Sequence, residues 1–179
     1  CELMYTYDKL FAAYNHTVAQ VLITGDDIEN VDRRTHFKNT VFRLLELGAI
    51  PVINENDTVS TEEIAVGDND TLAAIVAVNV KADLLVLLSD IDGLYTADPK
   101  KDSRAELIPV VENLDEKIYS VAGGAGSKLG TGGMNTKIKA AQICTDSGID
   151  MIIANGADPE KLYEAVAGKS IGTLFKGKK

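Results

Sequence analysis

A glycine-rich stretch that opens a helical pattern carries the clearest chemistry in this sequence. Residues 130–137 read Gly-Thr-Gly-Gly-Met-Asn-Thr-Lys. Glycines let backbone N–H groups approach an anion closely, and the start of a helix adds partial positive charge. Lys137 lies one turn into the helix and adds a full charge. The stretch predicts a phosphate-binding site, although its residues do not have the spacing of a Walker A motif. The alternative is that it is only a glycine linker before a helix.

Two clusters of Asn and Asp flank a single loop and could bind an amino acid. Residues 54–57 read Asn-Glu-Asn-Asp, and residues 67–70 read Gly-Asp-Asn-Asp. Carboxylates can bind an ammonium group, while amide and backbone N–H groups can bind a carboxylate. Each residue alone is more simply a turn or cap residue, and Asp68 or Asp70 could cap a helix over 70–80. Both clusters together favour a binding site.

A hydroxyl and a carboxylate leave the most apolar run of the chain together. Ser89 and Asp90 follow Leu-Leu-Val-Leu-Leu at 84–88. Ligands of open α/β sheets bind beyond the carboxyl ends of strands. The pair could line a nucleotide pocket or act through water on a metal. The alternative is a strand end followed by the Asp-Gly turn at 92–93.

The elements that must position these segments alternate along the chain. Helical periodicity covers residues 2–14, 31–47, 70–80, 133–147 and 158–167. Apolar or β-rich runs cover 18–24, 50–54, 84–88, 150–154 and 172–175. The run at 84–88 is apolar throughout, which is typical of a strand covered on both faces. The alternation predicts an α/β fold with a largely parallel sheet, in one domain over residues 1–179.

Composition excludes several classes of function. The net charge of −9 argues against nucleic acid as the main partner, because such binding needs a cationic surface. No apolar run is long enough to predict a membrane span. The cysteines, Cys1 and Cys144, form no Cys-x-x-Cys pair, so we expect no structural zinc site and a reducing, cytoplasmic environment.

The two histidines, His16 and His36, lie outside the three polar segments. A hydrolase that relies on a histidine base is therefore disfavoured. Phosphoryl transfer to a carboxylate needs no base, because the acceptor is already ionised at pH 7. Such an enzyme works by positioning its substrates and by stabilising charge, which suits an inventory of Asn, Asp, Gly and Lys.

At these segments the sequence resembles the amino-acid kinase family. The runs IPVINENDTVSTEEIAVGDND, LLVLLSDIDGLYTADP and GTGGMNTKIKAA occur in the order and at the spacing of that family, from Leu3 to about Phe175. The DGLYTADP run is shared widely across the family. The pair INEND and GDND, together with GTGGM-polar-TK, is typical of the branch that phosphorylates glutamate. The resemblance implies a three-layer α/β sandwich with a mainly parallel central sheet.

The resemblance also implies roles for individual residues. Those that would bind L-glutamate are Asn54, Asp57, Asp68, Asn69 and Asp70. Those that would bind ATP are Ser89, Asp90, Thr131, Gly132, Gly133, Met134, Asn135, Thr136 and Lys137. Lys137 would be catalytic, because it would neutralise charge on the transferring phosphoryl group. Ser89 stands where Thr is commoner, and Asn135 stands where Ser is frequent.

The implied reaction is transfer of phosphate from ATP to the glutamate side chain, which gives glutamyl 5-phosphate and begins proline biosynthesis. Mg²⁺ would be held mainly by the ATP phosphates, with no protein ligand named. Feedback inhibition by proline and a homo-oligomeric state are also implied. Two alternatives stay open: another acyl or phosphate kinase of this fold, and a non-catalytic fragment that binds a nucleotide or an amino acid.

One departure from the family concerns the start of the chain. Family members begin with a strand and a glycine-rich turn that carries a second phosphate-contacting Lys, followed by a Ser-Gly-Ala substrate loop. This sequence starts at Cys1 inside a helical pattern. We therefore interpret it as the N-terminally incomplete, C-terminal part of a kinase domain, without the PUA domain of some members. We expect such a fragment to be inactive and poorly stable alone.

Overall fold

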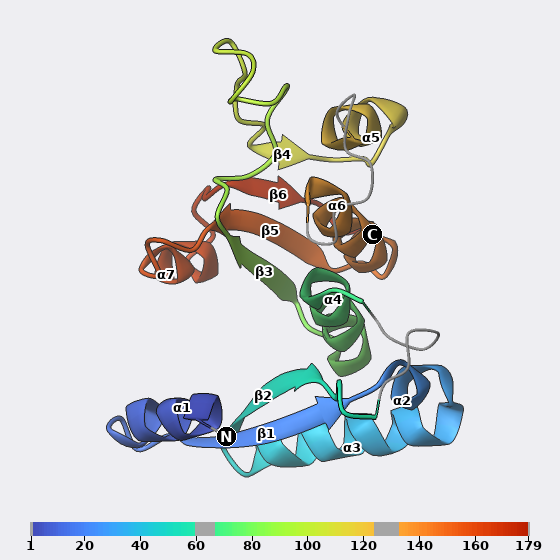
Figure 1. The fold of residues 1–179 in the computed structure, drawn as a ribbon, viewed down its shortest axis with the longest axis vertical. Coiled ribbons are helices and arrows are strands. Elements are labelled where there is room, and N and C mark those ends of the chain that lie inside the picture. The colour runs from blue at the N-terminus through green and yellow to red at the C-terminus, as the bar shows by residue number, and fades with distance from the viewer. Residues whose placement is uncertain (1, 60–66, 124–132, 179) are drawn as a thin grey trace. The chain divides into compact units, whose positions relative to one another are not determined.

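The computed structural model describes residues 2–59, 67–123 and 133–178. The chain divides into two compact units, Cys1–Leu72 and Ala73–Lys179 (Figure 1). Among the described elements, helices and strands alternate along most of the chain, as the sequence predicts, although a helix follows a helix at two points and a strand follows a strand at one.

The first unit is built on a pair of parallel strands. Its elements are α1 (Glu2–Ala12), β1 (Thr17–Ile23), α2 (Gly25–Glu29), α3 (Val31–Glu46), β2 (Ala49–Glu55) and the first turn of α4 (Asn69–Val80). β1 and β2 pair in parallel from Thr17 opposite Ala49 to Ile23 opposite Glu55. Helix α3 packs against β2 and buries Phe37 and Val41.

Side-chain caps define the helices that connect β1 to β2. The Asn30 side chain accepts hydrogen bonds from the backbone N–H groups of Asp32 and Arg33, and so starts α3. At the other end, Gly48 has φ of 72°, a left-handed conformation that suits the residue after a helix. The short helix α2 was not predicted. A reciprocal capping box between Thr24 and Asp27 stabilises its N-terminus.

The second unit holds a four-stranded mixed sheet. Its strands are β3 (Leu84–Ser89), β4 (Val110–Val111), β5 (Asp150–Asn155) and β6 (Thr173–Phe175). Its helices, besides the rest of α4, are α5 (Glu116–Gly123), α6 (Met134–Asp146) and α7 (Lys161–Val166). The strand order is β3-β5-β6-β4. β3 pairs in parallel with β5, and β4 with β6, whereas β5 and β6 are antiparallel.

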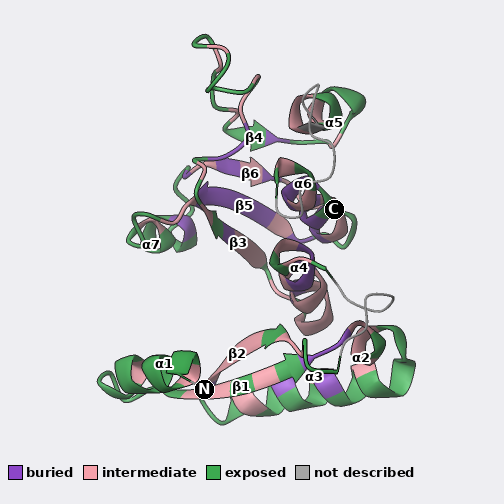
Figure 2. Ribbon diagram, viewed as in Figure 1, coloured by how far each residue is buried: buried purple, intermediate pink, exposed green. Residues whose placement is uncertain are grey.

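Successive residues of β5 face two different layers of helices. Met151 and Ile153, both fully buried, belong to the apolar cluster that includes residues of α4 and α6. Ile152 and Ala154 belong to a second cluster that includes Ala165 of α7. Figure 2 shows β5 as buried along most of its length. A sheet covered by helices on both faces makes three layers, which confirms the predicted α/β fold.

The differences from the predicted elements are local. Besides α2, the strand β4 and the helix α5 were not predicted. Helix α1 ends at Ala12 rather than at residue 14, and α7 begins at Lys161 rather than at residue 158. Residues 97–106 form an irregular segment, and most of them are exposed.

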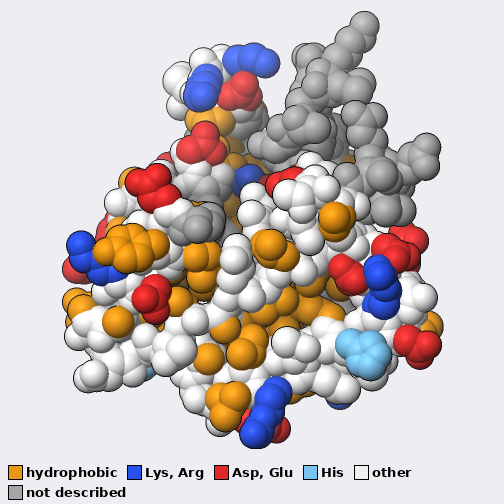
Figure 3. Space-filling model, turned by 60° about the horizontal axis from the view of Figure 1, so that its bottom comes forward, with side chains coloured by type: hydrophobic (Ala, Val, Ile, Leu, Met, Phe, Trp, Pro, Cys, Tyr) orange, Lys and Arg blue, Asp and Glu red, His pale blue; other side chains and the backbone are white. Residues whose placement is uncertain are grey.

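The described residues show neither a broad basic surface on the face drawn in Figure 3 nor a helix of membrane-spanning length. On the face in Figure 3, the Lys and Arg side chains of the described residues stand singly among acidic ones, and they form no continuous basic area there. Among the residues that the structure describes, no helix combines the length and apolar character that crossing a membrane requires.

Candidate functional site

The carboxyl end of β3 carries the first pair of predicted ligand residues. Ser89 is the last residue of β3, partly buried and opposite Asn155 of β5. Its Oγ donates to Oδ1 of the exposed Asp90 at 3.1 Å. The Gly156 N–H donates to the Ser89 carbonyl at 2.8 Å and holds the two strand ends together. Polar side chains of β3 and β5 therefore lie at one end of the sheet.

The N-terminus of α6 carries the second predicted set. Gly133 occupies the N-cap position, and no side-chain hydrogen bond caps this helix among the described residues. The Thr136 Oγ donates to the Gly133 carbonyl at 2.8 Å. Met134 packs against the apolar core, and Asn135 is exposed. Thr131 and Gly132 lie outside the described residues.

Lys137 is buried, with 8% of its surface exposed. It shares α6 with the buried residues Ile138, Ala140 and Ala141. Lysine is rarely buried to this extent in proteins unless it is paired. A buried cation in the first turn of a helix whose cap is a glycine is an arrangement suited to an anionic ligand.

The direction of α6 places these two sets at the same end of the sheet. A turn at residues 147–149 joins α6 to β5, and the two elements pack together in opposite directions (Figure 1). Helix α6 has 13 residues, a length of roughly 20 Å, and β5 has 6 residues, also roughly 20 Å. The N-terminus of α6 therefore points toward the end of the sheet formed by the carboxyl ends of β5 and β3, where Ser89 and Asp90 lie.

The first Asn and Asp cluster lies at the carboxyl end of β2, in the other unit. Asn54 is exposed and pairs in register with Leu22 of β1. Asp57 is exposed in the turn that follows. The Asn56 N–H donates to the Ile23 carbonyl at 2.8 Å, which fixes the start of this turn.

The second cluster forms the start of α4. Asp68 caps the helix: its Oδ1 accepts from the Thr71 N–H at 2.7 Å, and its Oδ2 accepts from the Thr71 hydroxyl at 2.8 Å. The predicted capping role is confirmed for this residue. Asn69 is exposed and Asp70 is partly buried, both in the first turn. Residues 60–66, which connect the two clusters, lie outside the described residues.

Three further polar residues gather beside Ser89 and were not predicted. Asp92 Oδ1 accepts from Asn155 Nδ2 at 2.9 Å, and Asp92 Oδ2 accepts from the Tyr95 hydroxyl at 3.0 Å. These bonds, the one from Asn155 above all, lower the pKa of Asp92. The bond to Asp92 raises the pKa of Tyr95. Asn155 ends its strand as Ser89 does, so the strand-end rule applied to β5 would have found it.

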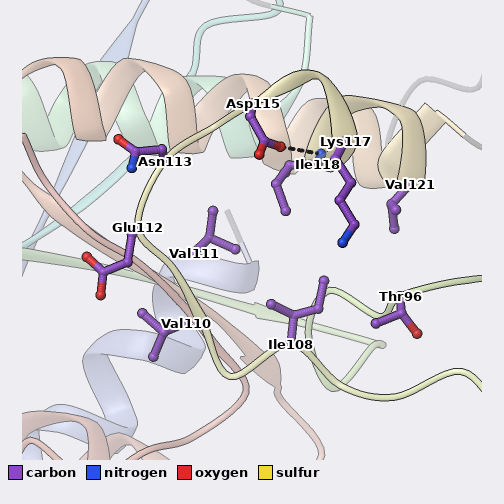
Figure 4. Close-up of a pocket in the computed structure, with 10 residues that line it drawn as sticks. All are labelled: Thr96, Ile108, Val110, Val111, Glu112, Asn113, Asp115, Lys117, Ile118 and Val121. Atoms are coloured by element: carbon purple, nitrogen blue, oxygen red, sulfur yellow. Dashed lines mark hydrogen bonds between the residues drawn. The ribbon is translucent and has the colours of Figure 1, made fainter.

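Two pockets lie away from the predicted residues. One of about 470 Å³ lies between α5, β4 and the segment from Thr96 to Ile108 (Figure 4). Apolar side chains such as Val111, Ile118 and Val121 form much of its wall, and Asp115 beside it accepts a 2.9 Å hydrogen bond from the Ile118 N–H. The other pocket, of about 400 Å³, lies along β1 and α3.

None of the residues that line these two pockets belongs to the predicted glutamate or ATP sets. Within residues 2–59, 67–123 and 133–178, no group of three or more His, Cys, Asp or Glu side chains is arranged to hold a metal ion.

Comparison with known proteins places the chain in a family. Residues 2–155 match the model of the amino acid kinase family. The chain is 54% identical over 173 residues to the glutamate 5-kinase of Clostridium tetani, and 54% identical over 177 residues to that of Carboxydothermus hydrogenoformans. These matches cover 97% and 99% of this chain, but only 65% and 47% of the two relatives.

Solved structures share the fold at much lower identity. An isopentenyl phosphate kinase matches with a TM-score of 0.67 at 18% identity, over 98% of this chain and 66% of that one. Carbamate kinase from Giardia lamblia bound to AMP-PNP matches with a TM-score of 0.64 at 14% identity, over 96% and 66%. The match of residues 2–155 to the family model shows that the chain belongs to the amino acid kinase family.

Proposed function

We propose that this chain supplies nucleotide- and acceptor-binding parts of a kinase that transfers the γ-phosphoryl group of ATP to the side-chain carboxylate of L-glutamate. The product would be glutamyl 5-phosphate, which begins proline biosynthesis. The observation that carries the proposal is identity of about half the residues to glutamate 5-kinases along nearly the whole chain. Because the chain spans 65% and 47% of the first two relatives, the activity refers to the full-length protein.

The nucleotide part of the proposal is supported by the end of the sheet in the second unit. A hydroxyl and a carboxylate, Ser89 and Asp90, lie at the end of the sheet toward which the N-terminus of α6 points. A helix N-terminus attracts phosphate through its N–H groups and its dipole. Among the described residues Gly133 leaves that terminus open, since a Cβ placed there would meet none of their atoms within 4 Å. The ATP-binding set would be completed by Met134, Asn135 and Thr136, with Thr131 and Gly132 outside the described residues.

Lys137 is the residue to which we assign transition-state stabilisation. The three non-bridging oxygens of a transferring phosphoryl group share negative charge, and a fixed cation in a water-poor site stabilises that charge strongly. With 8% exposure, Lys137 is screened little by solvent. The glutamate carboxylate is ionised at pH 7, so no base has to remove a proton from it. Positioning and charge then account for the reaction.

Mg²⁺ would be bound chiefly by the ATP phosphates. Magnesium favours oxygen ligands and usually takes one or two carboxylates together with phosphate oxygens. The Ser89 hydroxyl and the Asp90 carboxylate are oxygen donors of that kind. The ion would neutralise phosphate charge when it is bound.

The acceptor would be held by the two polar clusters of the first unit. Asn54 and Asp57 are exposed at the end of β2, and Asn69 is exposed at the start of α4, so these side chains can reach a ligand. The carboxylates of Asp57, Asp68 and Asp70 would attract the ammonium group, and the amides would bind the α-carboxylate. Inhibition by proline, assembly into a homo-oligomer and a cytoplasmic location are further parts of this proposal.

The test incubates the full-length protein with ATP, Mg²⁺ and glutamate and traps the acyl phosphate with hydroxylamine. We expect a hydroxamate that depends on glutamate, together with stoichiometric release of ADP. A signal with aspartate or another acid, but none with glutamate, would indicate a different kinase of this family. Nucleotide binding without any hydroxamate would indicate a non-catalytic binding module.

A further inference from the structure

A buried hydroxyl ties the segment after β3 to the last strand of the sheet. Thr173, the first residue of β6, has none of its surface exposed. Its Oγ1 accepts from the Leu94 N–H at 2.8 Å and donates to the Ile108 carbonyl at 2.7 Å. The Ile108 N–H in turn donates to the Leu94 carbonyl at 2.8 Å. One side chain therefore joins three segments that are far apart in the sequence.

The backbone around this hydroxyl is packed with no spare room. Gly93 has φ of 152°, and a Cβ there would lie 2.5 Å from Thr173 Oγ1. Gly172 has φ of 60°, and a Cβ there would lie 2.0 Å from the Ile153 carbonyl oxygen and 2.7 Å from that of Asp92. Both glycines adopt conformations that other residues rarely take, so the close approach of residues 92–94 to 172–173 depends on them.

The same segment is held a second time, at the surface. Asn155, at the end of β5, donates to Asp92 at 2.9 Å, and Tyr95 donates to the other carboxylate oxygen at 3.0 Å. The turn that begins at Ser89 and Asp90 is thus fixed from inside by Thr173 and from outside by Asn155. The Thr173 and Asn155 side chains bond to Leu94 and Asp92 of this turn, so their effect on a bound nucleotide would pass through the turn.

We propose that Thr173 and Asn155 are positioning residues, which hold the turn from Ser89 to Tyr95 in the shape that binds the nucleotide. This inference rests on the proposed function, because it assigns Ser89 and Asp90 to the ATP site. A threonine hydroxyl suits the inner position because it can accept from one backbone group and donate to another at the same time. Loss of the bond from Thr173 or of the bond from Asn155 would let the turn adopt other positions. Ser89 and Asp90 would then be displaced from the nucleotide.

The experiment uses the full-length protein and two variants, the isosteric Thr173→Val and the smaller Thr173→Ser. Valine removes the hydroxyl and serine keeps it. We expect Thr173→Val to raise the KM for ATP about three- to tenfold, which corresponds to one neutral hydrogen bond. Thr173→Ser should stay within about twofold of the unaltered protein, as should the KM for glutamate in both variants. Asn155→Ala, which alters an exposed bond, should raise the KM for ATP about threefold.

Ile152→Val is the matched control for stability. Ile152 is 5% exposed on the α7 side of β5, so this variant loses a buried methylene group without touching the turn. Its KM for ATP should not change even if its melting temperature falls as far as that of Thr173→Val. An equal rise in KM in both would mean that lost stability, not a loosened turn, causes the effect, and would overturn the inference.

Two further readouts keep the test decisive. If Thr173→Val does not fold, Asn155→Ala decides, and an unchanged KM for ATP in that variant overturns the inference. Amide hydrogen exchange at Leu94, whose N–H bonds to Thr173, tests the inner attachment without any nucleotide and should become faster in Thr173→Val. If the unaltered protein binds no ATP, both the proposed function and the role of the turn in nucleotide binding are refuted. If exchange at Leu94 is unchanged in Thr173→Val, the claim that the Thr173 hydroxyl holds the turn is refuted, whatever the protein binds.

Discussion

Replacing Lys137 by methionine isolates the charge of this buried side chain, because methionine keeps an unbranched apolar stem. Two unit charges about 4 Å apart interact by about 1 kcal/mol in water and by about 4 kcal/mol at an effective dielectric constant near 20. Because Lys137 is only 8% exposed, the effective dielectric constant near 20 applies to its charge rather than that of water. A loss of about 3–4 kcal/mol of transition-state stabilisation corresponds to a fall in kcat of about 10²- to 10³-fold.

The matched control is Lys139→Met, because Lys139 lies on the same helix but is exposed. Its kcat should stay within about threefold of the unaltered protein. Both variants are assayed by hydroxamate formation at saturating ATP and glutamate, and their helical content is checked by circular dichroism. The reasoning is refuted if Lys137→Met keeps kcat within threefold, or if both variants lose kcat equally.

Three other substitutions or measurements test single features of the structure. Asp68→Ala removes the cap of α4 and should lower the free energy of unfolding by about 1 kcal/mol, measured by urea titration, whereas Asp68→Asn should keep most of it. Burial raises the pKa of the Cys144 thiol from 9.0 to about 11, so its alkylation at pH 8, followed by mass spectrometry of its peptide, should be slow until the protein unfolds. Gly93→Ala should lower the melting temperature markedly, because its Cβ would lie 2.5 Å from Thr173 Oγ1 at a φ that alanine rarely adopts.

Each of these expectations has its own control. The matched variant for Gly93→Ala is Gly133→Ala, where the added Cβ meets no atom of the described residues within 4 Å, so its melting temperature should not change. Equal stability of the two alanine variants would contradict the packing described here.

For Cys144, the raised pKa also means that the folded state holds this proton more tightly than the unfolded chain. Its contribution to stability is complete below pH 9 and is lost as the pH rises toward 11. Rapid alkylation of native Cys144 would contradict its burial.

Periodicity predicted the elements that have a strong local signal. The strand at 84–88 and the helix at 70–80 both follow from residue patterns within one element. Strand β4 has only two residues, and its pairing partner is β6, so nothing local marks it as a strand. The antiparallel pairing of β5 with β6 likewise depends on a connection between distant segments.

The site shows the same division between local and distant signals. Ser89 and Asp90 could be predicted because they directly follow an apolar strand, and the Gly133 to Lys137 segment because glycines precede a helix. Thr173 could not, because a threonine beside a short apolar run has no special pattern. Its importance appears only when Leu94 and Ile108, distant in sequence, are seen to bond to its hydroxyl.

The position of β6 has a consequence for how the chain folds as it is synthesised. β6 lies between β5 and β4, so residues 173–175 are the centre of a sheet whose other strands leave the ribosome earlier. Val111 of β4 must wait for Phe175 before its backbone pairs. Distant pairings of this kind slow folding and leave apolar segments uncovered for longer. We expect the second unit to become protease-resistant in one late step, after β6 has emerged, rather than strand by strand.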